Sequence, residues 1–317
     1  MTTHPPRIAV LVPCYNEGLT VAAVVRDFAS ALPGATVYVY DNNSSDNTAE
    51  AARAAGAVVR HEARQGKGFV VQRMFADVEA DVYVLVDGDG TYDAAAAPAL
   101  VGRLLADQLD FVNGARREVN PDAYRRGHRF GNRLLTGLVQ NFFGRQFEDM
   151  LSGYKALSRR FVKSFPAMAR GFETETELLI HALRLSMPSA EIVTDYRERP
   201  VGSQSKLRTY RDGTLIMMMI ARLVKDERPL MFFGWIGYFT AAVGVLLGIP
   251  VVIHFIETGL VPRFPTAILS VALVIIGVLA FFVGLILDMV TRTRQEMKRL
   301  AYLAIPMFDG DVRKTTP

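Results

Sequence analysis

Val82-Tyr83-Val84-Leu85-Val86-Asp87-Gly88-Asp89 carries two acidic residues, two positions apart, directly after an apolar run. The run predicts a buried β-strand, and the carboxylates at its end predict a site for a divalent cation. Carboxylate oxygens are hard ligands that suit Mg²⁺ or Mn²⁺, and a cation held in this way neutralises the charge of a bound diphosphate. The alternative is an ordinary polar turn, because Asp-Gly pairs are common turn formers. The surrounding motifs decide between the two.

Two other loop motifs do not fit the same residues. An EF-hand loop that starts at Asp87 needs Gly at its sixth position and Glu at its twelfth, where this chain has Tyr92 and Pro98. Gly66-Lys67-Gly68 is not a Walker A loop, because His61 stands at the position of the first glycine and Lys67 is not followed by Ser or Thr.

Two further apolar runs precede this segment and end in polar residues. Ile8 to Pro13 leads into Cys14-Tyr15-Asn16-Glu17, and Val37 to Tyr40 leads into the segment Asp41 to Thr48. Helix-like stretches separate the runs, so their order predicts an open α/β sheet with mostly parallel strands. Ligands of such sheets bind beyond the carboxyl ends of the strands, and we expect the acidic clusters to converge there.

A set of motifs occurs in order along the chain. They are Pro13–Glu17, Asp41–Asp46, Gly66–Gly68, Asp87–Asp89, Asn113–Arg116, Asp149–Ser158, Gly171–Glu175 and Gly202–Leu207. The first four resemble the family 2 glycosyltransferases, which have the Rossmann-like GT-A fold. The full set is similar to one subgroup, the polyprenyl-phosphate glycosyltransferases, relatives of dolichyl-phosphate mannose synthase and of the bactoprenol glucosyltransferases. The resemblance covers nearly the whole chain.

The resemblance implies a donor site that contains Mg²⁺ or Mn²⁺. In it Asp41 reads the nucleotide base, Asp87 lies near the ribose and the metal, and Asp89 binds the metal. The implied nucleotide-sugar ligands are Pro13, Tyr15, Glu17, Asp41, Asn43, Lys67, Asp87, Gly88 and Asp89. The implied catalytic residues are Asp89 and Asp149, the second of which stands at the family's usual base position.

Some positions stay open. Many relatives follow the metal motif with a Leu-Gln pair, and this chain has Gly90-Thr91, so that Thr91 or Asp93 would have to supply any further metal ligand. Glu173 and Glu175 either form the acidic first turn of a helix from Thr176 to Leu185, where carboxylates interact favourably with the helix dipole, or act directly at the site.

The resemblance also implies polyprenyl phosphate as the acceptor. A phosphate monoester is already anionic at neutral pH, so its oxygen attacks the anomeric carbon with inversion and needs no strong base. Basic residues beside the apolar stripes 124–143 and 206–220 suit a phosphate at the membrane surface, although the stripes also fit packing on the domain or on another subunit. The predicted acceptor-phosphate ligands are Arg116, Arg129, Arg133, Ser203 and Lys206.

The C-terminal part of the chain predicts a membrane anchor. Residues 231–253 and 264–287 contain no charged side chain. Each run exceeds the roughly 20 residues that cross a bilayer core as a helix, and the loop between them is short. A pair of buried core helices is the alternative. We expect a two-helix transmembrane hairpin.

The charges that flank these runs predict the orientation. Basic residues precede the first run at Arg222, Lys225 and Arg228 and follow the second at Arg292, Arg294, Lys298 and Arg299, whereas the loop between the runs offers only Arg263. The positive-inside rule then places the catalytic domain and both termini in the cytoplasm, as a multi-pass protein of the cytoplasmic membrane. No apolar segment follows Met1 to Arg7 that would act as a cleavable signal.

The predicted organisation has four parts. They are a GT-A catalytic domain over 1–205, an amphipathic interfacial helix over 206–230, two transmembrane helices over 231–290 and a cytoplasmic tail over 291–317.

The predicted reaction is transfer of a sugar, with UDP favoured as the carrier, to polyprenyl phosphate. A GDP-mannose donor and a non-lipid acceptor are the alternatives, and a homo-oligomer is compatible with both. A processive polysaccharide synthase would carry a Gln/Arg-x-x-Arg-Trp motif, but the only tryptophan is Trp235, within the first apolar run. A non-enzymatic scaffold would be expected to have lost an acidic ligand. The modest net charge of +4 and its position beside the apolar runs do not indicate a nucleic-acid partner.

Overall fold

The computed structural model describes residues 5–118, 147–167, 174–197 and 228–307, together with Gly137 and Lys225. The chain divides into two compact units, which we describe separately. The first comprises Met1–Gly213 and Lys298–Pro317, and the second comprises Thr214–Met297.

The first unit is built on a seven-stranded sheet in the order β3-β2-β1-β4-β6-β5-β7. Strand β6 runs antiparallel to its neighbours β4 and β5, and the other pairs are parallel. The strands are β1 (Ile8–Cys14), β2 (Thr36–Asp41), β3 (Val58–His61), β4 (Val82–Leu85), β5 (Phe111–Glu118), β6 (Lys155–Ser158) and β7 (Ser189–Tyr196). The mostly parallel α/β sheet expected from the sequence is confirmed.

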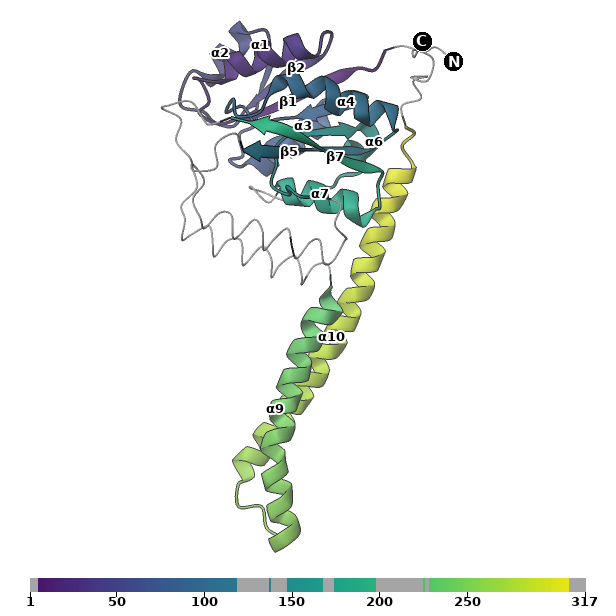
Figure 1. Cartoon of the computed structure of the whole chain (residues 1–317). Coiled ribbons are helices and arrows are strands. Elements are labelled where there is room, and N and C mark those ends of the chain that lie inside the picture. The colour runs from purple at the N-terminus through teal and green to yellow at the C-terminus, as the bar shows by residue number, and fades with distance from the viewer. Residues whose placement is uncertain are drawn as a thin grey trace. The chain divides into compact units, whose positions relative to one another are not determined.

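Helices cover both faces of the sheet (Figure 1). The helices α1, α2 and α4 lie on one face, and α3, α6 and α7 lie on the other. Their bounds are α1 (Val21–Ala31), α2 (Thr48–Ala54), α3 (Lys67–Asp77), the 3₁₀ turn η1 (Ala94–Ala96), α4 (Ala97–Ala106), α6 (Arg159–Ser164) and α7 (Thr174–Arg184). Helix α7 begins two residues earlier than the sequence predicted, and Glu175 lies in its first turn.

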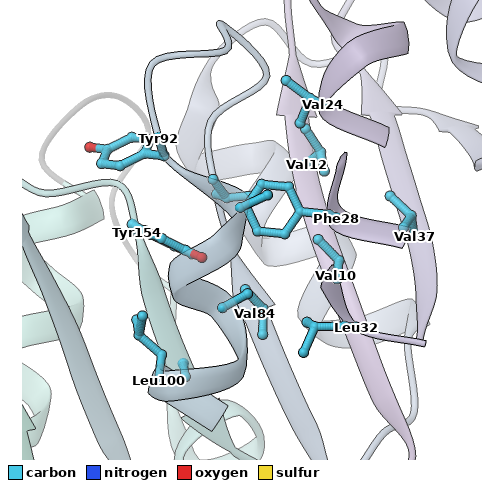
Figure 2. Close-up of a cluster of buried hydrophobic side chains, with 14 of the residues drawn as sticks. Val10, Val12, Val24, Phe28, Leu32, Val37, Val84, Tyr92, Leu100 and Tyr154 are labelled. Atoms are coloured by element: carbon cyan, nitrogen blue, oxygen red, sulfur yellow. The ribbon is translucent and has the colours of Figure 1, made fainter. Parts of the chain in front are cut away.

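The main core lies between the central strands and the helices α1 and α4. Val10 and Val84 project from neighbouring strands toward Phe28, and Figure 2 shows these side chains packed together with Leu100 of α4. The Phe28 ring meets the Tyr154 ring edge-on, with centroids 5.8 Å apart. Burying a side chain such as Phe28 stabilises the fold by about 1.5–3 kcal/mol, so this core fixes the strand ends that carry the polar loops.

The second unit consists mainly of two long helices, α9 (Pro229–Thr258) and α10 (Phe264–Leu303), and α10 belongs to it as far as Met297. Both are long and apolar enough to cross a membrane. Small residues let them approach closely: a Cβ atom on Gly237 would lie 2.5 Å from the Gly277 carbonyl oxygen, and one on Gly244 would lie 2.8 Å from the Ser270 carbonyl oxygen. Position 237 thus meets 277 and 244 meets 270, which makes the pair antiparallel.

The helices extend beyond the charge-free runs. Helix α9 includes Glu257 and Thr258, and α10 continues through the basic segment after Asp288 to Leu303. Several predicted features lie outside the described residues: most of the stripe 124–143, most of 206–230, and the residues Arg129, Arg133, Glu173, Ser203 and Lys206.

Candidate functional site

The loops that follow β1 and β2 are fastened to each other by short polar contacts. The Asn16 backbone N–H donates to Ser44 Oγ at 2.8 Å, and Asn16 Oδ1 accepts the Ser45 N–H at 2.7 Å. The Glu17 N–H donates to Thr48 Oγ1 at 2.9 Å. Asn16 has a left-handed φ of 53°, a conformation that Asn tolerates better than most residues. The polar segments expected to converge from the sequence do so here.

The Asp46 carboxylate takes part in the same contact. It accepts the Gly18 N–H and the Thr48 N–H, both at 3.0 Å. The N-cap residue of α2, directly before Thr48, is Asn47, whose side chain makes no capping hydrogen bond. Asp46 therefore joins the start of α2 to the β1 loop.

Asp41 and Asn42, at the end of β2, have different roles in the structure. Asn42 Nδ2 donates to the carbonyl oxygens of Glu62 and Arg64, both at 2.8 Å, and its Oδ1 accepts the Gly66 N–H at 2.8 Å. Asn42 therefore holds the loop that leads into α3. Asp41 is 8% exposed and its Oδ2 lies 3.4 Å from His61 Nδ1. Its buried Oδ1 has no hydrogen-bond partner among the described residues.

Asp87 pairs with Lys67, whose ammonium group also pairs with a glutamate of α7. Lys67, the first residue of α3, donates from Nζ to Asp87 Oδ1 at 2.5 Å and also to the Glu175 carboxylate of α7. Although burial opposes it, these two carboxylates raise the pKa of Lys67. Lys67 therefore stays a cation, and it holds Asp87 and Glu175 on either side of one ammonium group.

Asp89 is 3% exposed and is oriented by the next turn. Its Oδ1 accepts from Thr91 Oγ1 at 2.6 Å and from the Thr91 N–H at 3.2 Å. Thr20 Oγ1 donates to the Gly88 carbonyl oxygen at 2.7 Å, which joins this turn to the start of α1. Thr91 thus orients the Asp89 carboxylate through two hydrogen bonds.

Asp149 forms a second centre at the edge of β5. The Arg116 guanidinium donates from Nε to Asp149 Oδ2 at 2.6 Å and from Nη2 to Asp149 Oδ1 at 2.8 Å. Burial favours the neutral acid, but the hydrogen bonds from Arg116 outweigh it and lower the pKa of Asp149. Asp149 is therefore a paired carboxylate, and Arg116 also lies over the Tyr196 ring at 5.4 Å.

Most of the predicted donor-site residues come together at these strand ends. The β1, β2 and β4 ends and their loops carry Pro13, Tyr15, Glu17, Asp41, Asn43, Asp87, Gly88 and Asp89, and α3 brings Lys67 to Asp87. The sequence interpretation left out Asn42, which organises the loop before α3, and assigned Glu175 only as one of two alternatives. The signal for Asn42 was its position next to Asp41 in a strand-end motif.

Comparison with known proteins now identifies the family. The sequence profile described as Glycosyl transferase family 2 matches residues 9–165. Glycosyltransferase AglJ of Haloferax volcanii is 32% identical over 302 residues, which cover 94% of this chain and 99% of AglJ. A dolichyl-phosphate hexose transferase of the same organism is 28% identical over 221 residues, which cover 70% of this chain and 95% of that protein.

A solved structure resembles the first unit. It is glucosyl-3-phosphoglycerate synthase from Mycobacterium tuberculosis in complex with Mn²⁺, UDP-glucose and phosphoglyceric acid. The TM-score is 0.56 at 27% sequence identity, over 69% of this chain and 79% of the synthase. The chain belongs to glycosyltransferase family 2, its first unit has the GT-A fold, and the family resemblance inferred from the motifs is confirmed.

Proposed function

We propose that this family 2 glycosyltransferase moves a hexose from a UDP-sugar to a polyprenyl phosphate at a membrane surface, with inversion at the anomeric carbon. The observation that carries the proposal is the presence, in one chain, of a GT-A acidic site and two antiparallel helices of membrane-spanning length. A relative that is named a dolichyl-phosphate hexose transferase supports the same acceptor class.

The surroundings of Asp41 support the proposal that the donor carries uracil. Its Oδ2 faces His61, and its buried Oδ1 lacks a donor among the described residues. An unpaired buried acceptor costs about 1–3 kcal/mol unless a ligand supplies the donor. Uracil has one imide N–H that matches one acceptor oxygen, whereas guanine presents an N–H and an amino group side by side and so matches a free carboxylate with both oxygens available. The solved relative was crystallised with UDP-glucose.

The acidic motif fits a divalent cation shared with the substrate. The described residues contain no group of three or more His, Cys, Asp or Glu side chains that could enclose a metal. Mg²⁺ and Mn²⁺ sites of this kind use one or two carboxylates and leave the remaining positions to phosphate and water. Asp87 and Asp89 would hold the metal, whose chemistry would be to neutralise the diphosphate leaving group. Lys67 keeps Asp87 in place beside it.

Arg116 and Asp149 support an acceptor site. Asp149 is paired with Arg116 and its pKa is lowered, so it is a poor base and a good support for the guanidinium. A phosphate monoester needs no strong base, because it is already an anion. We therefore assign Arg116 to the acceptor phosphate and Asp149 to the orientation of Arg116, with Arg129, Arg133, Ser203 and Lys206 as further proposed phosphate ligands.

The membrane arrangement is part of the proposal. We retain a catalytic domain over 1–205, an interfacial segment over 206–230, transmembrane helices over 231–290 and a tail over 291–317, with the catalytic domain and both termini in the cytoplasm. In support, the antiparallel helices put the start of α9 and the end of α10 on one side, and residues from Lys298 onward group with the catalytic unit.

A matrix of donors and acceptors tests the function. The purified full-length chain is incubated with Mn²⁺ and radiolabelled UDP-glucose, UDP-N-acetylglucosamine or GDP-mannose, each with polyprenyl phosphate, free sugars or peptides. We expect a lipid-extractable product from a UDP-sugar and polyprenyl phosphate only. Product from GDP-mannose would favour the mannose synthase alternative, and product in the aqueous phase alone would favour a hairpin-anchored enzyme with a non-lipid acceptor.

A further inference from the structure

Lys155, the first residue of β6, is a fully buried lysine behind the site. It is 0% exposed, and its Nζ donates to Asn113 Oδ1 at 2.7 Å and lies 5.3 Å from the centre of the Phe111 ring. No carboxylate of the described residues lies within ion-pair distance of it. Burial is the main cause that lowers the pKa of Lys155, to about 8.

A buried ammonium that has only a neutral amide as its hydrogen-bond acceptor, among the residues that the structure describes, is a costly way to fill a core position. Desolvation of a charge outweighs one hydrogen bond, and an apolar side chain of the same length would generally be as stable or more so. Stability alone therefore gives no reason for lysine at this position. The partner of Lys155 suggests another reason.

Asn113 connects Lys155 to the main chain at Asp149. Its Nδ2 donates to the Asp149 carbonyl oxygen and to Glu191 Oε2, both at 2.7 Å. Glu191, on β7, also accepts the Glu148 N–H at 2.8 Å. The Asp149 carbonyl group and the Glu148 N–H are thus held by one network, in which Lys155 fixes the orientation of the Asn113 amide by donating to its oxygen.

We propose that Lys155 is a positioning residue for transfer: through Asn113 it fixes the main chain of Asp149, and so sets the place of the Arg116 guanidinium that Asp149 holds. This inference rests on the proposed acceptor role of Arg116. The charged groups that act on the ammonium are Glu175 of α7, Asp149, Lys67 of α3 and Arg116 of β5, with Glu191 of β7 on the far side of Asn113.

The pH dependence separates positioning from a purely structural role. As pH rises through about 8, Lys155 becomes a neutral amine, which is a weaker donor and can also accept a hydrogen bond. It then no longer selects one orientation of the Asn113 amide, so kcat is expected to fall. Stability should change in the opposite sense. The unfolded chain, with an ordinary lysine pKa of about 10.4, binds more protons than the folded chain above pH 8, so this group raises the free energy of unfolding with pH there.

The experiment compares full-length Lys155→Met with a matched control, Lys163→Met. Lys163 of α6 donates to the Phe75 and Val78 carbonyl oxygens and pairs with Glu79, remote from the proposed acceptor residues. We measure kcat, both KM values and UDP binding with Mn²⁺ from pH 6.5 to 9.5. For Lys155→Met we expect kcat about 10-fold lower at pH 7, UDP affinity within about 2-fold, and no alkaline fall near pH 8. Lys163→Met should lower stability and keep the wild-type profile.

Two outcomes would overturn the inference: Lys155→Met with wild-type kcat and an unchanged alkaline limb, or donor affinity that weakens as much as kcat. If Lys155→Met does not fold, the wild-type chain labelled with [ε-¹³C]lysine gives the answer. A lysine signal and kcat that titrate together near pH 8 support the inference, and an alkaline limb with no such signal refutes it. The assay uses whichever acceptor the wild-type enzyme glycosylates, so a non-lipid acceptor would refute the proposed function alone.

Discussion

At the scale of single residues, the backbone at Gly88 has no room for a side chain. A Cβ atom on Gly88 would overlap Cys14 Sγ and would lie 3.4 Å from Val12 Cγ1. We expect Gly88→Ala to push the Asp87–Asp89 turn away from β1, with a stability loss of about 1–3 kcal/mol and little transfer activity. Thermal unfolding and initial rates measure both effects.

A second substitution and a control test whether steric overlap with Cys14 causes the effect of Gly88→Ala. Cys14→Ala removes the sulfur that the new methyl group would meet, so Cys14→Ala/Gly88→Ala should recover part of the lost stability and rate. Gly102→Ala is the control, because nothing lies within 4 Å of a Cβ at this position inside α4. It should be neutral or slightly stabilising, since Ala favours a helix interior over Gly by about 1 kcal/mol. A double variant no better than Gly88→Ala would contradict the steric explanation.

Asp89 provides the test of the metal site. Asp89→Asn keeps the shape that Thr91 recognises but removes the charge, so we expect the fold to survive and transfer to fall by about 100-fold or more. The stabilisation that Mn²⁺ and UDP together give the wild type in a thermal-shift assay should disappear, and EDTA should stop the unmodified enzyme. Asp195→Asn, which removes an exposed partner of Arg117, is the matched control. Full turnover in EDTA would exclude the metal-dependent mechanism.

The sequence predicted the residues that stand at strand ends, and Lys67 as well, but it did not predict which side chains from the helices meet there. Asp41, Asp87 and Asp89 follow apolar runs, and the parallel sheet brings such positions together. The contact between Lys67 and Glu175 depends on how α7 packs on the far face, which no local pattern encodes. No local pattern indicated the burial of Lys155, because lysine is almost never fully buried.

At the scale of elements, the last turn of α10 contacts a buried carboxylate, Asp110, through Tyr302. Asp110 is 0% exposed, and its carboxylate accepts from Ser158 Oγ at 2.6 Å, from the Arg160 guanidinium and from Tyr302 Oη at 2.7 Å. The Arg160 guanidinium also lies over the Tyr302 ring at 4.8 Å. The segment after Lys298 is therefore fastened to the catalytic unit at Asp110.

This contact predicts the effect of Tyr302→Phe. The variant keeps the ring under Arg160 and removes one hydrogen bond to a buried carboxylate, so we expect a loss of about 1.5–3 kcal/mol in the free energy of unfolding of the catalytic unit. Tyr238→Phe is the control, because Tyr238 is 63% exposed on α9. Unfolding of the full-length chain in detergent is followed by hydrogen exchange of β5 and β6. Equal protection in both variants would show that the contact contributes nothing.

Element types followed from sequence patterns more closely than element ends did. The strands β1, β2 and β4 were expected within a residue or two, because apolar runs between polar loops define them. Helix α10 runs past its apolar stretch to Leu303, since Arg, Gln, Glu, Met and Lys are good helix formers and no breaker intervenes. The charge-free run over 264–287 predicts the part of α10 that would contact lipid, and it does not predict the end of the helix.

At the scale of the whole molecule, the chain enters α9 from the catalytic unit and returns to that unit after α10. Glycine contacts make the two helices antiparallel, so the loop over residues 259–263 lies at the opposite end of the pair from Pro229 and Leu303. If the pair crosses a bilayer, the loop and the catalytic unit must face opposite sides. By the positive-inside rule, the basic flanks at Arg228 and Arg292 then predict a catalytic unit on the cytoplasmic side, as proposed above.

Cysteine labelling tests this arrangement on the full chain, because the sole native cysteine, Cys14, is 2% exposed and gives a low background. Leu260→Cys, in the loop, should react with a membrane-impermeant maleimide added to intact spheroplasts. Ala304→Cys, just after α10, should react only once the membrane is permeabilised. The unsubstituted chain is the background control, and transfer activity confirms that each variant folds. Labelling of both positions only after permeabilisation would mean that the helices do not cross the membrane, and labelling of Ala304→Cys in intact cells would reverse the orientation and place the catalytic site outside.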